Sequence, residues 1–272
     1  MYLKYFSASF ISIVFQLTAF ELNAETYRVG IVPQQSASKL AKQWVPILNY
    51  VSRESGHKLI FKTATDIPAF EKQLANGKYD LAYMNPYHYT VYHQNSNYHA
   101  IAKARNKRLK GIIVTRKDSK KNKLEDFRGK TLVFPSPNAF AASILTQAEF
   151  SQRHINIDAK YVSSHDSVYR NVAQGRYPAG GGVLKTFNNI DNTIQQQLKI
   201  IWTTKGYTPH AIAAHKNIST DHIHSIQRAF IQLSETENGR RMLAKVNLSG
   251  FESAQNTDWD DVRNLNIELL NN

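Results

Sequence analysis

The chain has 272 residues and an ordinary share of apolar and aromatic side chains, which is long for one compact core and sufficient for two lobes. It contains no cysteine, and this excludes disulfide bonds, thiolate catalysis and cysteine metal ligands. The formal net charge of +13 could attract nucleic acid or steer small anions, but no nucleic-acid-binding motif accompanies it, and we interpret the basic segment 103–123 as a solvated face.

The first 24 residues are interpreted as a secretory signal peptide. Lys4 supplies the positive charge, residues 5–20 form the apolar stretch, and Leu22-Asn23-Ala24 fits a cleavage site. The alternative is a membrane anchor, but the apolar run is short for a span and contains Ser, Gln and Thr. We therefore expect a periplasmic, soluble mature chain with no stable membrane insertion.

The next segment alternates strand and helix patterns. The predicted strands are 27–32, 57–63 and 79–84. The first helix is expected to begin at Ser36 or Ser38, and the second at Thr65 or Asp66, because these side chains are good N-caps. The order β-α-β-α-β predicts a parallel sheet with helices on its faces.

A second unit of the same kind follows. Further strands are predicted at 100–104, 111–116, 131–134, 160–162, 179–183, 199–203 and 210–215. Helices are predicted from about Asn138 to Gln152, from Ser164-His165-Asp166 onward, and between 183 and 199. After residue 215 we expect helices only, at about 219–232, 235–245 and 257–270.

This order predicts an α/β chain with two lobes and a ligand cleft between them. We expect the chain to cross between lobes near 105–111 and 203–209. The expected domains are a signal peptide at 1–24, a first lobe at 25–107 with 208–272, and a second lobe at 108–207. Two crossover strands form a hinge, and the cleft is where a small ligand would bind.

Four segments, taken in order, carry a resemblance to a known family. They are GIVPQQSASKLAKQWVPILNYVSRESG, TATDIPAFEKQLANGKYDLAYMNPYHY, LEDFRGKTLVFPSPNAFAASIL and SSHDSVYRNVAQGRYPAG. The series resembles the periplasmic substrate-binding proteins of phosphate, phosphite and phosphonate ABC transporters, the PhnD-like family. The resemblance implies a type 2 periplasmic-binding-protein fold and a cleft that closes on an oxyanion, without catalysis.

The resemblance also implies where the ligand is contacted. Thr65, Asn85 and Tyr87 match first-lobe corners, with Tyr87 as the aromatic contact, and His165 matches the family histidine that hydrogen-bonds the oxyanion. The family's hydroxyl-rich helix start falls on Asn138-Ala139-Phe140-Ala141, where this chain has no Ser or Thr. Contact there would use backbone N–H groups and Asn138, with Phe140 shaping the wall.

Position alone adds three more candidates. Gln34 follows the first strand, Lys185 begins the helix after the Gly180-Gly181-Gly182 run, and Ser136 is a hydroxyl near the Asn138 corner. The candidate ligand-binding residues are Gln34, Thr65, Asn85, Tyr87, Ser136, Asn138, Ala139, Phe140, His165 and Lys185.

Structural roles compete for several of these residues. Asn138 could be a plain helix N-cap, and Ser164 or His165 could cap the helix that follows. The aromatic run 87–93 could be a core-facing helix stripe, and the glycine run could be a close backbone approach or a mobile connection. His88 and His93 are five residues apart and do not share a helical face, so no metal site is expected.

No pattern typical of an enzyme accompanies the fold. A GxSxG elbow is absent from the sequence, and Ser164-His165-Asp166 is contiguous, whereas triad members converge from separate elements. We therefore expect no catalytic residue and no cofactor. The expected partners of a monomeric chain are a small anionic ligand and an ABC permease; the alternative is a sensing subunit that presents its ligand to a membrane signalling protein.

Overall fold

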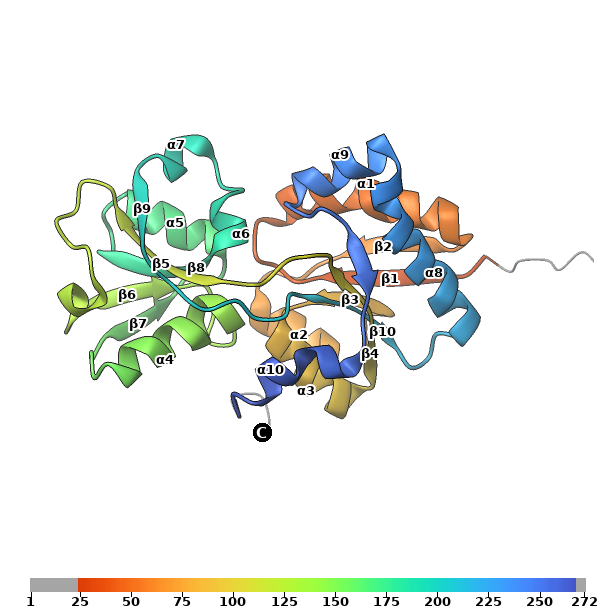
Figure 1. The fold of residues 1–272 in the computed structure, drawn as a ribbon, viewed down its shortest axis with the longest axis horizontal. Coiled ribbons are helices and arrows are strands. Elements are labelled where there is room, and N and C mark those ends of the chain that lie inside the picture. The colour runs from red at the N-terminus through yellow and green to blue at the C-terminus, as the bar shows by residue number, and fades with distance from the viewer. Residues whose placement is uncertain (1–23, 268–272) are drawn as a thin grey trace, which may run out of the picture.

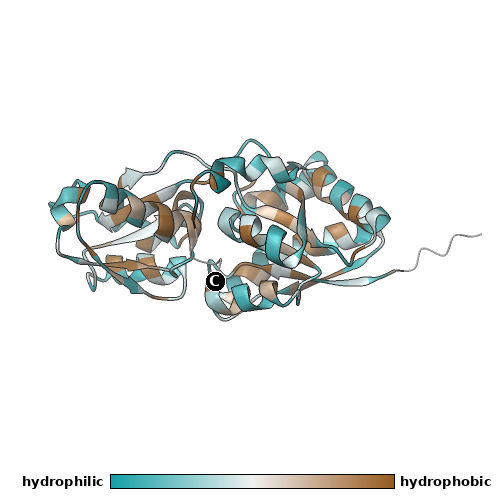
Figure 2. Cartoon of the chain, turned by 90° about the horizontal axis from the view of Figure 1, so that it is seen from below, coloured by the Kyte–Doolittle hydropathy of each residue, from teal (hydrophilic) through white to brown (hydrophobic). Residues whose placement is uncertain are grey.

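Two β-sheets, each covered by helices, form two lobes joined by two crossing segments (Figure 1). This computed structural model describes residues 24–267. The predicted signal peptide lies outside the described residues except for Ala24. Figure 2 shows hydrophobic residues concentrated inside each lobe, with hydrophilic ones on the outer helices. The predicted α/β class with two lobes is confirmed.

The first lobe contains a six-stranded sheet in the order β11-β4-β10-β3-β1-β2. Its strands are β1 (Thr26–Ile31), β2 (Lys58–Lys62), β3 (Leu81–Met84), β4 (Tyr98–Ala104), β10 (Ala211–His215) and β11 (Phe251–Ser253). As predicted, β1 runs parallel to β2 and β3. The other pairings, of β10 with β3 and β4 and of β11 with β4, are antiparallel.

Helices cover both faces of this sheet. The first face carries α1 (Ala37–Ser55), α8 (Thr220–Gln232) and α9 (Glu237–Lys245), and the other carries α2 (Ile67–Ala75), α3 (Pro86–Ser96) and α10 (Asp260–Arg263) (Figure 1). The Asp66 side chain accepts a hydrogen bond from the Ala69 N–H at 2.8 Å and so caps α2. Gly56, with φ of 77°, ends α1 in the left-handed conformation that glycine favours.

The second lobe contains a five-stranded sheet in the order β7-β6-β8-β5-β9. Its strands are β5 (Gly111–Arg116), β6 (Thr131–Phe134), β7 (Asp158–Tyr161), β8 (Ala179–Val183) and β9 (Leu198–Thr203). Its helices are α4 (Leu145–Gln152), α5 (His165–Ala173), α6 (Leu184–Phe187) and α7 (Asn192–Gln195), with a 3₁₀ turn η1 (Leu124–Phe127) and a π-helical turn η2 (Phe140–Ile144). Strand β6 is parallel to β7 and β8, whereas β5 is antiparallel to β8 and β9.

The glycine run on β8 allows close packing. A Cβ atom on Gly181 would lie 2.0 Å from the Ala142 carbonyl oxygen, and one on Gly182 would lie 2.3 Å from the Tyr169 hydroxyl. Larger residues would therefore push η2 and α5 away from the sheet. Of the two interpretations left open by the sequence, close backbone approach accounts for these glycines.

The crossing segments pair with each other. The chain passes between the sheets at 105–110, after β4, and at 204–210, after β9. Leu109 and Tyr207 form an antiparallel bridge, with N···O distances of 2.7 Å and 2.9 Å. Two paired strands make a narrow connection about which the lobes can rotate.

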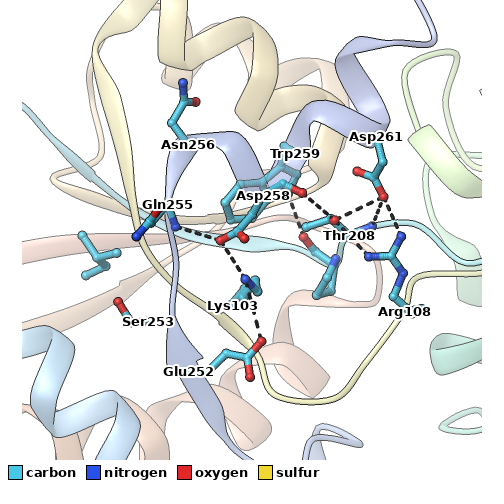
Figure 3. Close-up of polar contacts among 12 residues, drawn as sticks. Lys103, Arg108, Thr208, Glu252, Ser253, Gln255, Asn256, Asp258, Trp259 and Asp261 are labelled. Atoms are coloured by element: carbon cyan, nitrogen blue, oxygen red, sulfur yellow. Dashed lines mark hydrogen bonds and ion pairs between the residues drawn. The ribbon is translucent and has the colours of Figure 1, made fainter.

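Residues 258–261, in the C-terminal segment, form hydrogen bonds with both crossing segments (Figure 3). One carboxylate oxygen of Asp261 accepts hydrogen bonds from the Arg108 guanidinium at 2.7 Å and from the Thr208 N–H at 2.9 Å. The Trp259 indole N–H donates to the Pro209 carbonyl at 2.9 Å. Residues 258–261 therefore brace the hinge from the first lobe.

Three predicted elements were wrong in detail. The expectation of helices only after residue 215 missed β11, whose three residues pair with β4. The helix predicted at 257–270 is a 3₁₀ turn η4 (Asn256–Trp259) followed by α10, and its last predicted residues lie outside the described chain. The helix predicted between 183 and 199 is two short helices, α6 and α7.

Candidate ligand-binding cleft

A small cavity lies between the two lobes. Its accessible volume is about 10 Å³, which leaves room for about one water molecule. Its lining residues are Val32, Gln34, Ile67, Asn85, Leu109, Ala139, Phe140, Ala141, Ala142, His165, Val183 and His210. Neither Asp, Glu, Lys nor Arg is among them, so recognition inside the cavity would use neutral groups.

The topology explains why these residues meet. Gln34 and Asn85 follow the carboxyl ends of β1 and β3, and the η2 segment and His165 follow the carboxyl ends of β6 and β7. Carboxyl ends of neighbouring parallel strands lie at the same edge of a sheet, where ligands bind in α/β folds. The two such edges face each other across the cavity.

The start of η2 lines the cavity and has free backbone N–H groups. Ala139 occupies the N-cap position and makes no side-chain cap. Within the described chain, the N–H groups of Phe140, Ala141 and Ala142 have no hydrogen-bond acceptor. Free N–H groups at the positive end of a helix favour an anion. The predicted helix therefore begins at Phe140 rather than Asn138, and Asn138 is not its cap.

His165 is a buried, neutral side chain at the start of α5. Ser164 caps this helix, because its hydroxyl accepts the Ser167 N–H at 3.1 Å. Burial lowers the pKa of His165 to about 3, so the ring is uncharged near neutral pH. Its Nδ1 lies 3.3 Å from the Thr186 hydroxyl. The Thr186 hydroxyl donates to the Val183 carbonyl at 2.9 Å, so it does not fix the tautomer of the ring. The tautomer with its proton on Nε2 can donate to an oxyanion.

His210 is a cavity residue that the sequence did not reveal. Its ring is stacked on Tyr83 with centroids 4.9 Å apart, and its buried Nε2 has no hydrogen-bond partner. Burial, with Lys185 nearby, lowers its pKa well below the usual value. The one available signal was its position next to Pro209, at the end of the second crossing.

Direct contacts hold the lobes together beside the cavity. The Asn85 amide donates to the Asn138 carbonyl at 3.3 Å, and the Asn138 amide donates to the Glu71 carboxylate at 3.2 Å. The other oxygen of Glu71 lies 2.9 Å from His88 Nε2. Farther along the cleft, the His165 N–H donates to the Gln34 carbonyl at 3.0 Å. Asn138 therefore acts between the lobes.

The structure brings only part of the candidate set into the cavity. Gln34, Asn85, Ala139, Phe140 and His165 line it. Lys185 lines an adjoining pocket, and Asn138 lies beside the cavity in the contacts just described.

Three candidates lie elsewhere. Thr65 is exposed, and Ile67 lines the cavity in its place. Tyr87 is buried and lines a separate pocket with Arg263. It follows Asn85 by two residues, a rotation of about 200° around the helix axis, so the two side chains lie on opposite sides of α3. Ser136 is buried in a groove with Tyr161.

Two negative findings apply to residues 24–267. No three His, Asp or Glu side chains in this range gather as they would around a metal ion. No helix in the range combines the length and apolar character needed to cross a membrane.

Comparison with known proteins agrees with this geometry. The family described as "ABC transporter, phosphonate, periplasmic substrate-binding protein" matches residues 29–259. The phosphate-import protein PhnD of Mycolicibacterium smegmatis is 24% identical over 240 residues, covering 80% of this chain and 74% of that protein.

Solved structures of similar proteins share the fold. A binding protein of a phosphonate ABC transporter from Pseudomonas aeruginosa has a TM-score of 0.82 at 17% identity, covering 90% of this chain and 86% of that one. PhnD1 from Prochlorococcus marinus (MIT 9301), in complex with methylphosphonate, has a TM-score of 0.81 at 17% identity, covering 89% and 98%.

Proposed function

The chain belongs to the family of periplasmic substrate-binding proteins of phosphonate ABC transporters, and from this premise we propose that it captures a small phosphorus oxyanion by lobe closure and delivers it to an ABC permease. The proposed ligands are phosphate, phosphite and small phosphonates. Proteins of this family bind and hand over a ligand rather than transform it, so the cleft needs no catalytic residue. Residues 1–24 would direct export to the periplasm, and we propose that the mature chain acts as a monomer.

The observation that carries the proposal is the set of neutral donors facing the cavity. Three N–H groups at the start of η2 have no acceptor in the described chain, and the neutral His165 ring lies in the same lining. An oxyanion accepts several hydrogen bonds at once, and charge-assisted bonds are stronger than neutral ones. Backbone N–H groups at the start of η2 would thus replace the hydroxyl side chains that the family carries there.

Lobe closure would assemble these donors with the opposite wall. The cavity lining combines Gln34 and Asn85 from one lobe with the η2 segment and His165 from the other. We propose lobes at 25–107 with 208–272 and at 108–207, rotating about the paired crossing segments. The hydrogen bonds from Asn85 to Asn138 and from Asn138 to Glu71 would form only on closure.

The similar proteins support a phosphorus oxyanion as the ligand. One relative is a phosphate-import protein, and one structural neighbour is solved with methylphosphonate. Both ligands are small anions, and the lobes would have to part for either to enter the cavity, whose accessible volume is about 10 Å³.

A thermal-shift panel tests the proposal. Phosphate, phosphite and methylphosphonate are compared with sulfate, acetate, choline and glucose. A ligand at 100 times its Kd stabilises the folded state by about 2.7 kcal/mol, so at least one phosphorus oxyanion should raise the unfolding temperature by several degrees. A shift with choline or glucose, and none with a phosphorus oxyanion, would contradict the proposal.

A further inference from the structure

A second, larger pocket adjoins the cavity at the hinge. Its accessible volume is about 160 Å³, and it shares Leu109, Val183 and His210 with the cavity lining. Its outer walls come from the first crossing segment and from the start of α6. The two pockets are therefore adjacent, with His210 between them.

The outer pocket is strongly basic. Its lining includes Lys107, Arg108, Lys110 and Lys185, and no Asp or Glu. Arg108 is already paired with Asp261. Within the described chain, the ammonium groups of Lys107 and Lys110 have no ion-pair or hydrogen-bond partner. Unpaired cations around one concave pocket raise the local concentration of anions.

Lys185 is the cation nearest to the cavity wall. Its ammonium donates to the Tyr83 hydroxyl at 3.0 Å and lies 5.3 Å from the centre of the Tyr83 ring. Tyr83 is stacked on His210, which lines both pockets. His210 therefore lies between the cavity and the side chains of Lys185 and Tyr83, which line the outer pocket. No carboxylate in either lining pairs with the Lys185 ammonium, so it is available to an anion.

We propose that this pocket is a second anion subsite, and that the preferred ligand is a phosphonate carrying an additional negative group such as a carboxylate. The inference rests on the proposed function, since it assumes that the phosphonate head occupies the inner cavity. The second group would bind Lys185, assisted by Lys110. A ligand with an ammonium group would be disfavoured, because neither lining supplies an acidic side chain.

Titration calorimetry with matched ligands tests the inference. Phosphonoacetate is compared with isobutylphosphonate, which has nearly the same shape without the second charge, and with methylphosphonate and 2-aminoethylphosphonate. We expect phosphonoacetate to bind about tenfold more tightly than isobutylphosphonate, a difference of about 1.4 kcal/mol. The advantage should shrink between 20 mM and 500 mM salt, because salt screens partly exposed charges.

Variants locate the effect. Lys185→Met should bring the affinities for phosphonoacetate and isobutylphosphonate within about threefold of each other, a difference below 1 kcal/mol. Lys185→Arg, which keeps the charge, should retain the advantage of phosphonoacetate. Lys130→Met removes an exposed cation of the same lobe that lines neither pocket, and should change nothing.

The outcomes separate this inference from the proposed function. Equal affinities for phosphonoacetate and isobutylphosphonate, with methylphosphonate still bound, would overturn the second subsite and leave the proposed function standing. Equal effects of Lys185→Met and Lys130→Met on phosphonoacetate binding would also overturn the second subsite alone. Failure of every phosphonate and of phosphate to bind would overturn both.

Discussion

His165 combines two properties that suit it to a neutral binding cavity. It is 1% exposed, and burial lowers its pKa to about 3. An uncharged imidazole donates one hydrogen bond without bringing a second charge into a dry site. His210 has the same character, since burial lowers its pKa as well. The two rings give the cavity donors whose state does not change near neutral pH.

Acid should destabilise the protein through His165. The unfolded ring, with a pKa near 6.5, binds a proton between about pH 6.5 and pH 3, whereas the folded ring does not. Stability is therefore complete above pH 6.5 and is lost as the pH falls, by about 1.4 kcal/mol between pH 7.5 and 5.5 for this one group.

Urea unfolding of the wild type and of His165→Gln at both pH values measures this loss. The variant should lose about 1.4 kcal/mol less than the wild type on acidification. His224→Gln, at an exposed position on α8, is the control and should behave as the wild type does. An identical pH dependence in wild type and His165→Gln would contradict the assignment.

The cavity residues differ in how readily the sequence reveals them. His165 was included through the resemblance, since its place at a helix start left a capping role equally open. His210 and Val183 were not predicted as cavity residues. His210 lies at the end of the second crossing segment and Val183 at the end of β8, and the two come together only because of the way the lobes pack. Tyr87 was included through the resemblance, but the rotation of α3 turns it toward α10.

At the scale of elements, η2 depends on β8. The π-helical turn brings its Ala141 and Ala142 carbonyls against Gly111 and Gly181, and its first residues line the cavity. The sequence showed the glycine run and the missing Ser and Thr as separate features. In the structure the two features are linked. The glycines let the η2 backbone pack closely against the sheet, and in the absence of Ser and Thr side chains the backbone N–H groups are the hydrogen-bond donors at the start of η2.

Gly181→Ala should disrupt this arrangement. The new Cβ would lie 2.0 Å from the Ala142 carbonyl, so η2 would have to shift. We expect a loss of about 1–3 kcal/mol of stability, as for overpacked cores, together with weaker phosphonate binding. Gly129→Ala is the control: its positive φ also costs stability, but no atom lies within 4 Å of the added Cβ, so phosphonate binding should stay at the wild-type level. Wild-type binding by Gly181→Ala would contradict the role of η2.

The contacts of residues 258–261 with the crossing segments are a second feature at the scale of elements, and the sequence did not predict them. β11 has three residues, η4 and α10 four each, and such short elements carry no clear periodicity. The long strands, helices and caps of both β-α-β-α-β units were predictable because local pattern and burial agree there. The antiparallel additions β10 and β11 depend on long-range pairing.

Asp261→Asn should loosen this brace. The carboxylate accepts from Arg108 and from the Thr208 N–H, and hydrogen bonds to charged groups contribute about 1.5–3 kcal/mol each where they are shielded. Because these groups are partly exposed, we expect a loss of about 1–2 kcal/mol in urea unfolding. Asp260→Asn, which affects an exposed ion pair with Arg263, should cost less than about 0.5 kcal/mol. Equal losses would contradict the brace.

At the scale of the whole molecule, charge and shape act together. The net charge of +13 attracts anions over the whole surface, the basic pocket concentrates them at the hinge, and the inner cavity receives them with neutral donors. The sequence predicted the excess charge and the two lobes. It could not show that the cations lie outside the cavity and the neutral groups inside, because this separation arises only when the lobes meet.

Titration of methylphosphonate into the wild type and into His165→Ala, followed by calorimetry, tests the central claim most directly. We predict one site per chain, with a Kd raised about tenfold or more in the variant, since a hydrogen bond to a charged group contributes about 1.5–3 kcal/mol. A wild-type affinity in His165→Ala, or no binding of methylphosphonate, phosphite or phosphate by the wild-type protein, would contradict the account.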